Sequence, residues 1–112
     1  MPIVNIQHSY DLTYGSLPNQ IEEKLRPILA ENLSVKDVVL SPKDFSISFI
    51  RVTGNPVSPI TLIILAEDLA DRNTRRDEIS ENIKSALLSK MNWSENKLRV
   101  GLFLMPMGWS DT

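Results

Sequence analysis

The spacing of apolar residues predicts four strands and two helices in the order β-α-β-β-α-β. Residues 2–7 are apolar and β-branched, which is typical of a strand, and Pro2 is tolerated as the first residue of one. Residues 45–52 begin with apolar side chains that alternate with serine, which predicts a half-buried strand. Residues 60–65 form a continuous apolar run, which is typical of a strand buried on both faces. Residues 98–105 form the last predicted strand.

Two segments carry apolar residues at helical spacing. A first helix is predicted to begin near Leu17, with Ser16 as its N-cap, and Pro27 is expected to kink it. Its apolar stripe is formed by Ile21, Leu25, Ile28, Leu29 and Leu33. A second helix is predicted over residues 74–91, with Ile79, Ile83, Leu87 and Met91 at strict i+4 spacing. Residues 67–73 are predicted to form a polar loop, and residues 38–40 either prolong the first helix or form a second short one.

The two halves of the chain resemble each other, which predicts a single domain over residues 1–112 with an internal repeat. The first β-α-β unit covers about residues 2–53, and the second covers about residues 59–105. The first strands align at an offset of 57 residues, which pairs Pro2-Ile3 with Pro59-Ile60, and the helices align at an offset of 58. The fold class is therefore α+β, with a mixed four-stranded sheet and both helices on one face.

The other face of this sheet also needs a cover. Phe45, Ile47 and Phe49, together with the two-sided strand over residues 60–65, are too many apolar residues to hide under two helices. A chain of 112 residues has little surplus core of its own. We therefore expect a homo-oligomer in which the bare sheet faces pack together.

Composition narrows the possible functions further. The chain has 12 basic and 14 acidic residues and a net charge of −2, so no basic footprint for nucleic acid is expected. It has no cysteine and one histidine, His8, which disfavours a metal site and a Ser-His-Asp triad. The longest apolar run is too short to span a bilayer, and the first residues lack the basic region of a signal peptide. We expect a cytoplasmic protein without a cofactor.

The candidate chemistry lies at the N-terminus. Proline at position 2 is small enough for the initiator methionine to be removed, which would expose a secondary amine at the start of a buried strand. Apolar surroundings and nearby arginines both disfavour the charged form of an amine. The neutral amine of Pro2 could then act as a general base on a carbon acid next to a carbonyl, while arginines hold a carboxylate of the substrate.

Four short motifs give the sequence its resemblance to a known family. They are the start Met1-Pro2-Ile3-Val4, which contains Pro2, the segment 71–74, the segment Leu98-Arg99-Val100 and the tail Met107-Gly108-Trp109. With them, the chain resembles the tautomerase superfamily, which includes 4-oxalocrotonate tautomerase, 5-carboxymethyl-2-hydroxymuconate isomerase, malonate semialdehyde decarboxylase and macrophage migration inhibitory factor. The resemblance covers nearly the whole chain, and the long members of the family are trimers.

The resemblance implies a cofactor-independent tautomerase or isomerase of small 2-oxo or enol acids. Pro2 matches the catalytic proline, Arg72 and Arg99 match arginines that bind substrate carboxylate, and Phe103 and Trp109 could supply an apolar wall. The resemblance also implies a homotrimer with a small carboxylate substrate. On the same scaffold, a decarboxylase or a dehalogenase is possible.

Two other interpretations stay open at this point. The first half lacks a loop arginine between Leu12 and Gly15, which favours a non-enzymatic oligomeric scaffold or ligand-binding member of the same fold. The ferredoxin-like fold has the same β-α-β-β-α-β order and would make the chain a small-molecule-binding module. That fold predicts a dimer, antiparallel pairing of the first and third strands, and no use for the N-terminal proline.

Overall fold

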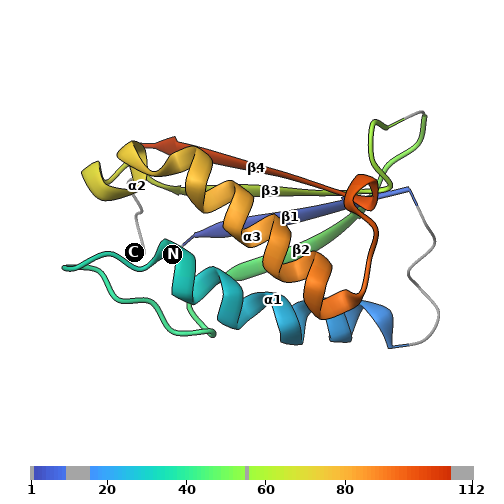
Figure 1. Cartoon of the computed structure of the whole chain (residues 1–112), viewed down its shortest axis with the longest axis horizontal. Helices are drawn as coiled ribbons and strands as arrows, with labels where there is room; N and C mark the ends of the chain where they lie inside the picture. Colours follow the sequence, from blue (N-terminus) through green and yellow to red (C-terminus); the bar gives the residue numbers. More distant parts are fainter. Residues whose placement is uncertain (1, 10–15, 55, 107–112) are drawn as a thin grey trace, which may run out of the picture.

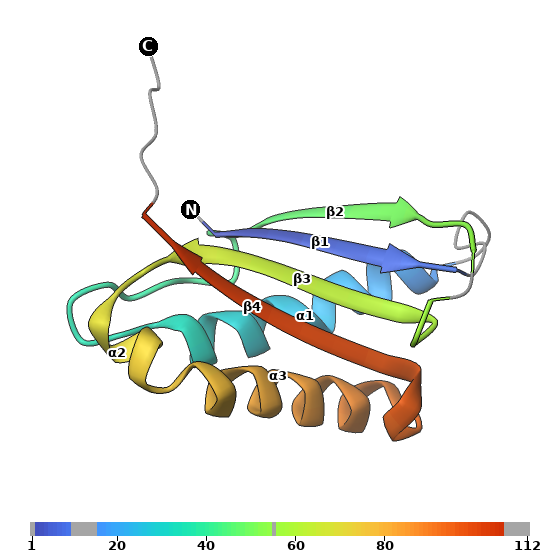
Figure 2. The ribbon, with the colours of Figure 1, turned by 90° about the horizontal axis from the view of Figure 1, so that it is seen from above.

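The computed structural model describes residues 2–9, 16–54 and 56–106, and it has a single sheet covered by helices on one face (Figures 1 and 2). The strands are β1 (Ile3–His8), β2 (Ser46–Arg51), β3 (Ile60–Glu67) and β4 (Leu98–Met105). The helices are α1 (Leu17–Leu33), α2 (Ala70–Thr74) and α3 (Arg76–Met91), and the short 3-10 helix η1 (Glu95–Lys97) follows α3.

The strand order in the sheet is β2-β1-β3-β4, with β1 parallel to β2, β3 parallel to β4 and β1 antiparallel to β3. Figure 2 shows α1 and α3 side by side on the same face of this sheet. The predicted mixed sheet is therefore confirmed. The antiparallel pairing of β1 with β3 also occurs in the ferredoxin-like fold, but there the first two strands are separated by the third. Because β2 pairs directly with β1, the ferredoxin-like alternative is wrong.

Two local predictions are also wrong. The segment predicted as a polar loop over residues 67–73 contains α2, whose turn is closed by a backbone hydrogen bond from Asn73 to Leu69. Residues 38–40 form neither a longer first helix nor a second one. Val35 and Val38 instead exchange two backbone hydrogen bonds, of 3.0 and 3.1 Å, which reverse the chain after α1.

The core lies between the sheet and the two long helices. On β1 and β3, every second residue is buried, and Val4, Ile6, Leu62 and Ile64 are fully buried. They pack against the apolar stripes of α1 and α3 that the spacing predicted, and Ile21, Leu25, Ile79 and Ile83 are at most 1% exposed. The main apolar contact of the sheet is therefore with the helices.

The distribution of apolar residues between the two sheet faces differs from the prediction. Phe45, Ile47 and Phe49 all contact the core under the helices, because Ile47 lies beside the inward-facing Val4. The uncovered face instead carries Ile63 and Leu65, the other half of the two-sided strand. Together with Ile3, Phe103 and Met105, these two residues form what we call the open face. The open face has no cover within the described part of the chain.

The structure also corrects the alignment of the repeat. An offset of 57 pairs Val4, which is fully buried, with Thr61, which lies on the other face of the sheet. A shift of one residue turns a strand over, because successive side chains alternate between the faces. An offset of 58 pairs Val4 with the inward-facing Leu62 and agrees with the helices. The counterpart of Pro2 is therefore Ile60, and not Pro59.

Candidate functional site

Pro2 lies directly before β1, in the middle of the sheet, and it is buried. Its carbonyl oxygen accepts a 3.1 Å hydrogen bond from the backbone N–H of Ser46, which extends the ladder between β1 and β2. The registers place Phe45 on one side of Pro2 and Ala66 on the other, and both are at most 4% exposed. The residue predicted to be catalytic thus lies in the apolar surroundings that its proposed chemistry needs.

Arg72 lies in α2, at the same end of the sheet, and its side chain is only 2% exposed. Its Nε donates to the carbonyl of Leu33 at 2.9 Å, and its Nη1 donates to the carbonyl of Glu67 at 3.1 Å. The last carbonyls of a helix have no partner within the helix, so the first bond satisfies the C-terminus of α1. Burial lowers the pKa of Arg72, and the nearby Glu67 carboxylate opposes this shift. Arg72 thus connects the end of α1 to the end of β3.

Arg99 lies at the opposite end of the sheet from Pro2. It pairs with Thr61, which pairs with Gln7, so it is displaced from Pro2 by five residues along the strands, or roughly 16 Å. Arg99 is exposed, whereas its neighbour Leu98 points into the core. Its side chain is therefore on the open-face side of the sheet, opposite to Pro2. Within one chain, the structure does not bring Arg99 together with Pro2 or Arg72.

Phe103 is level with the start of β1 but on the other face of the sheet from Pro2. It pairs with Leu65, which pairs with Ile3, and its side chain is 52% exposed on the open face. Its ring lies over Gly101, where an added Cβ would be only 3.0 Å from the ring atom Cε2. Trp109, the other predicted wall residue, lies outside the described residues.

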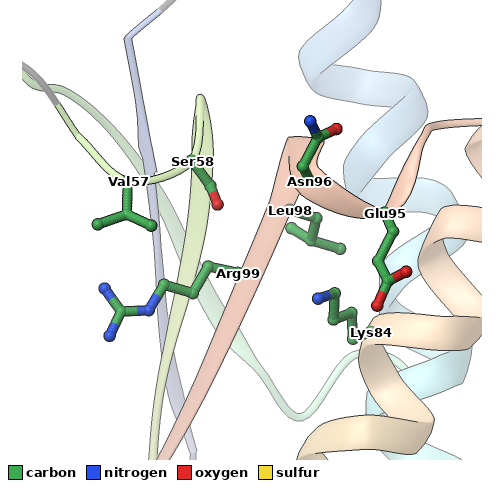
Figure 3. A pocket seen from close by; sticks show the side chains of 7 residues that line it. All are labelled: Val57, Ser58, Lys84, Glu95, Asn96, Leu98 and Arg99. Carbon is green, nitrogen blue, oxygen red and sulfur yellow. The ribbon is translucent and has the colours of Figure 1, made fainter.

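A cavity of about 590 Å³ lies beside the start of β4 (Figure 3). Arg99 and its neighbour Leu98 line it, together with five residues that the sequence analysis did not single out. The five are Val57, Ser58, Lys84, Glu95 and Asn96. They come from the loop before β3, from α3 and from η1, which are far apart in the sequence, so no local motif indicates this cavity.

Two other kinds of site are not found among the described residues. Within residues 2–9, 16–54 and 56–106, no group of three His, Cys, Asp or Glu side chains is placed to hold a metal ion. None of the helices described is both long and apolar enough to cross a membrane.

No protein-family model matches the sequence, and neither does any curated protein. Solved structures do match over nearly the whole chain. Leishmania major MIF2 matches with a TM-score of 0.66 and 16% identity, covering 100% of this chain and 96% of its own. A fused 4-OT, solved as a symmetric trimer, matches with a TM-score of 0.66 and 10% identity, over 97% of this chain and 92% of its own.

The fold is that of the tautomerase superfamily. A further match with this fold is Pt0534, solved after inactivation by 2-oxo-3-pentynoate. It has a TM-score of 0.64 and 13% identity and covers 97% of this chain and 92% of its own. The resemblance inferred from the sequence is thus confirmed for the tautomerase fold. Sequence identities of 10–16% show a shared fold and not a shared activity. An activity has to be argued from the residues of this chain.

Proposed function

We propose that this chain is a cofactor-independent tautomerase or isomerase of small 2-oxo or enol acids, with Pro2 as general base. The observation that carries the proposal is the position of Pro2, which is buried before the central strand β1 in a tautomerase fold. Once Met1 is removed, the Pro2 nitrogen becomes a secondary amine. Burial disfavours its charged form, so that the neutral amine takes a proton from the carbon next to the carbonyl and returns it at the other end of the enol.

If Arg99 binds the substrate at Pro2, the proposed site needs more than one copy of the chain. Because Arg99 and Pro2 lie at opposite ends of one sheet, an arginine that binds the carboxylate of the substrate at Pro2 comes from a neighbouring copy of the chain. We therefore propose a homotrimer whose sites lie between subunits, with Arg99 as the carboxylate ligand. The two backbone hydrogen bonds and the burial of Arg72 favour a structural role for that residue.

The open face is the surface proposed to pack in this trimer, and Phe103→Glu tests it. A charge placed in an apolar interface costs several kcal/mol when it has no partner, so the variant is expected to lose the trimer and to sediment as a smaller species. Val39→Glu is the matched control, because Val39 is 80% exposed and lies outside the sheet. Sedimentation equilibrium measures the masses. A monomeric native protein, or a Phe103→Glu variant that stays trimeric, contradicts this arrangement.

Covalent labelling tests the proposed role of Pro2. The probe is 2-oxo-3-pentynoate, the compound that inactivated Pt0534. A neutral amine adds to the triple bond of this probe. A bond forms between nitrogen and carbon, the proton of the amine moves to the neighbouring carbon, and nothing leaves. Protein that lacks Met1 is therefore expected to gain the full mass of one probe molecule per chain, located on the peptide that begins with Pro2.

Untagged protein is compared with protein that carries an uncleaved N-terminal extension, in which the Pro2 nitrogen is an amide. The extended protein is expected to gain no mass at Pro2. If the protein with a free Pro2 is not labelled, or if native protein retains Met1, then Pro2 is not the base. The non-enzymatic scaffold or ligand-binding member of the fold is then the better interpretation.

A further inference from the structure

The two halves of the chain differ in the space between the long helix and the start of the strand that follows it. In the first half an arginine side chain fills this space and binds backbone carbonyls, and in the second half the space is a cavity. In the first half, Arg26 on α1 donates from Nη1 to the carbonyl of Pro42 at 3.1 Å and to that of Phe45 at 2.9 Å. These two bonds connect α1 to the segment that leads into β2. Arg26 therefore occupies the space between its helix and the start of the following strand.

The helices correspond at an offset of 58 residues, and the strands β2 and β4 at an offset of 53. Lys84 on α3 is thus the counterpart of Arg26, and Leu98 is the counterpart of Phe45. Both of these residues line the cavity of about 590 Å³. A lysine lacks the forked donors of an arginine, and Lys84 makes no hydrogen bond to this segment among the described residues. The space that Arg26 bridges in the first half thus stays open beside Lys84.

The polar groups around this cavity favour an anion. Neither Lys84 nor Arg99 belongs to the ion pairs formed within the described residues. Ser58 is only 7% exposed, and among those residues its hydroxyl has no hydrogen-bond partner. In Figure 3 the Lys84 amine and the Ser58 hydroxyl are both directed toward Leu98 at the start of β4, while the Arg99 guanidinium extends away from Lys84. Glu95 is the one acidic residue of the lining, so the cations exceed the anions by one.

We propose that this cavity binds a small oxyanion, a carboxylate or a phosphate, between the ammonium of Lys84 and the hydroxyl of Ser58. The half-buried lysine supplies a charge-assisted hydrogen bond, and the hydroxyl donates a second one. The proposed anion site uses Lys84 and Ser58 and neither Pro2 nor Arg99, so its ligands differ from those of the proposed catalytic site, although Arg99 lines the same cavity. Glu95 weakens the binding by repulsion and thereby sets its strength.

A titration followed by amide chemical shifts in NMR tests this proposal, with malonate in one series and inorganic phosphate in the other, at constant ionic strength. Saturable shifts are expected at Ser58, Glu95 and Asn96, for the anion that fits. Lys84→Gln is expected to weaken the binding about tenfold or more, because a charge-assisted hydrogen bond is lost. Glu95→Gln is expected to tighten the binding, because it removes the repelling carboxylate.

Lys90→Gln is the matched control, because Lys90 lies on the same helix, is exposed and does not line the cavity. It changes the net charge of the chain by the same amount as Lys84→Gln. Equal weakening by both variants would reduce the effect to net charge and overturn the proposal. So would shifts that fail to saturate with both anions, or a Glu95→Gln variant that binds no more tightly than the native protein.

Discussion

Replacing Pro2 with alanine is expected to lower kcat/KM for the ketonisation of a small enol acid by about 10²-fold, the lower end of the usual contribution of a general base. The fold is expected to survive, because the contact of residue 2 with β2 uses only its carbonyl oxygen. An alanine keeps that oxygen and leaves a primary amine in the same place, so some activity remains. Steady-state kinetics and a far-UV circular dichroism spectrum measure both effects.

Two comparisons separate the role of the amine from the shape of the proline. Protein with an uncleaved N-terminal extension keeps Pro2 but has no basic nitrogen there, and it is expected to lose more activity than the alanine variant. The rate of the native protein is expected to rise with pH until the amine is neutral and then to level off, because the neutral form is the base. Full activity in either altered protein, or a rate that falls over this range, argues against Pro2 as the base.

The sequence predicts the fold well because most of its signals are local. The i+4 spacing of residues such as Ile79 and Ile83 requires one buried helix face, and the alternation after Phe45 requires a strand. The matched halves then lead to the mixed sheet. The same local reasoning fails at α2, because a polar five-residue helix has no apolar period and depends on one buried side chain.

The sequence predicts less well toward which face of the sheet a strand residue points, and which residues correspond in the two halves. An apolar run such as residues 60–65 does not show which of its members point toward the helices, and an alignment that is wrong by one residue reverses them. This is why Pro59 looked like the counterpart of Pro2. The alternating burial along β1 and β3 settles the matter, and burial is a property of the assembled sheet.

The candidate site shows the same limit. Pro2 is predicted as the base because it is residue 2 and leads directly into an apolar strand of a doubled β-α-β chain; the structure shows that it is buried, and its catalytic role stays a prediction. The sequence predicts Arg72 and Arg99 as ligands of a substrate carboxylate because both match arginines of the family. The sequence does not show toward which face or end of the sheet their side chains point. Arg72 bonds to Leu33, which is 39 residues away, and Arg99 lines a cavity with residues of three other segments. Such contacts follow from the topology of the sheet and not from any local pattern.

Arg72→Met is expected to lower the free energy of unfolding by about 2–4 kcal/mol, without a large effect on substrate binding. The variant removes both donors from the carbonyls of Leu33 and Glu67, and a buried carbonyl without a partner costs about 1–3 kcal/mol. Part of that loss is offset, because a buried guanidinium no longer has to be desolvated. Urea unfolding with an unchanged m-value measures the difference.

Arg75→Met is the control, because Arg75 forms an exposed ion pair with Glu78 three residues later. Such pairs contribute about 0–1 kcal/mol, so its stability should stay close to that of the native protein. The pair of variants decides between the two roles of Arg72. A substrate ligand, when removed, raises KM and leaves stability unchanged, whereas a residue that connects α1 to β3 does the reverse. If Arg72→Met unfolds like the native protein but raises KM, the role implied by the family resemblance is right, and the two backbone hydrogen bonds contribute little to the fold.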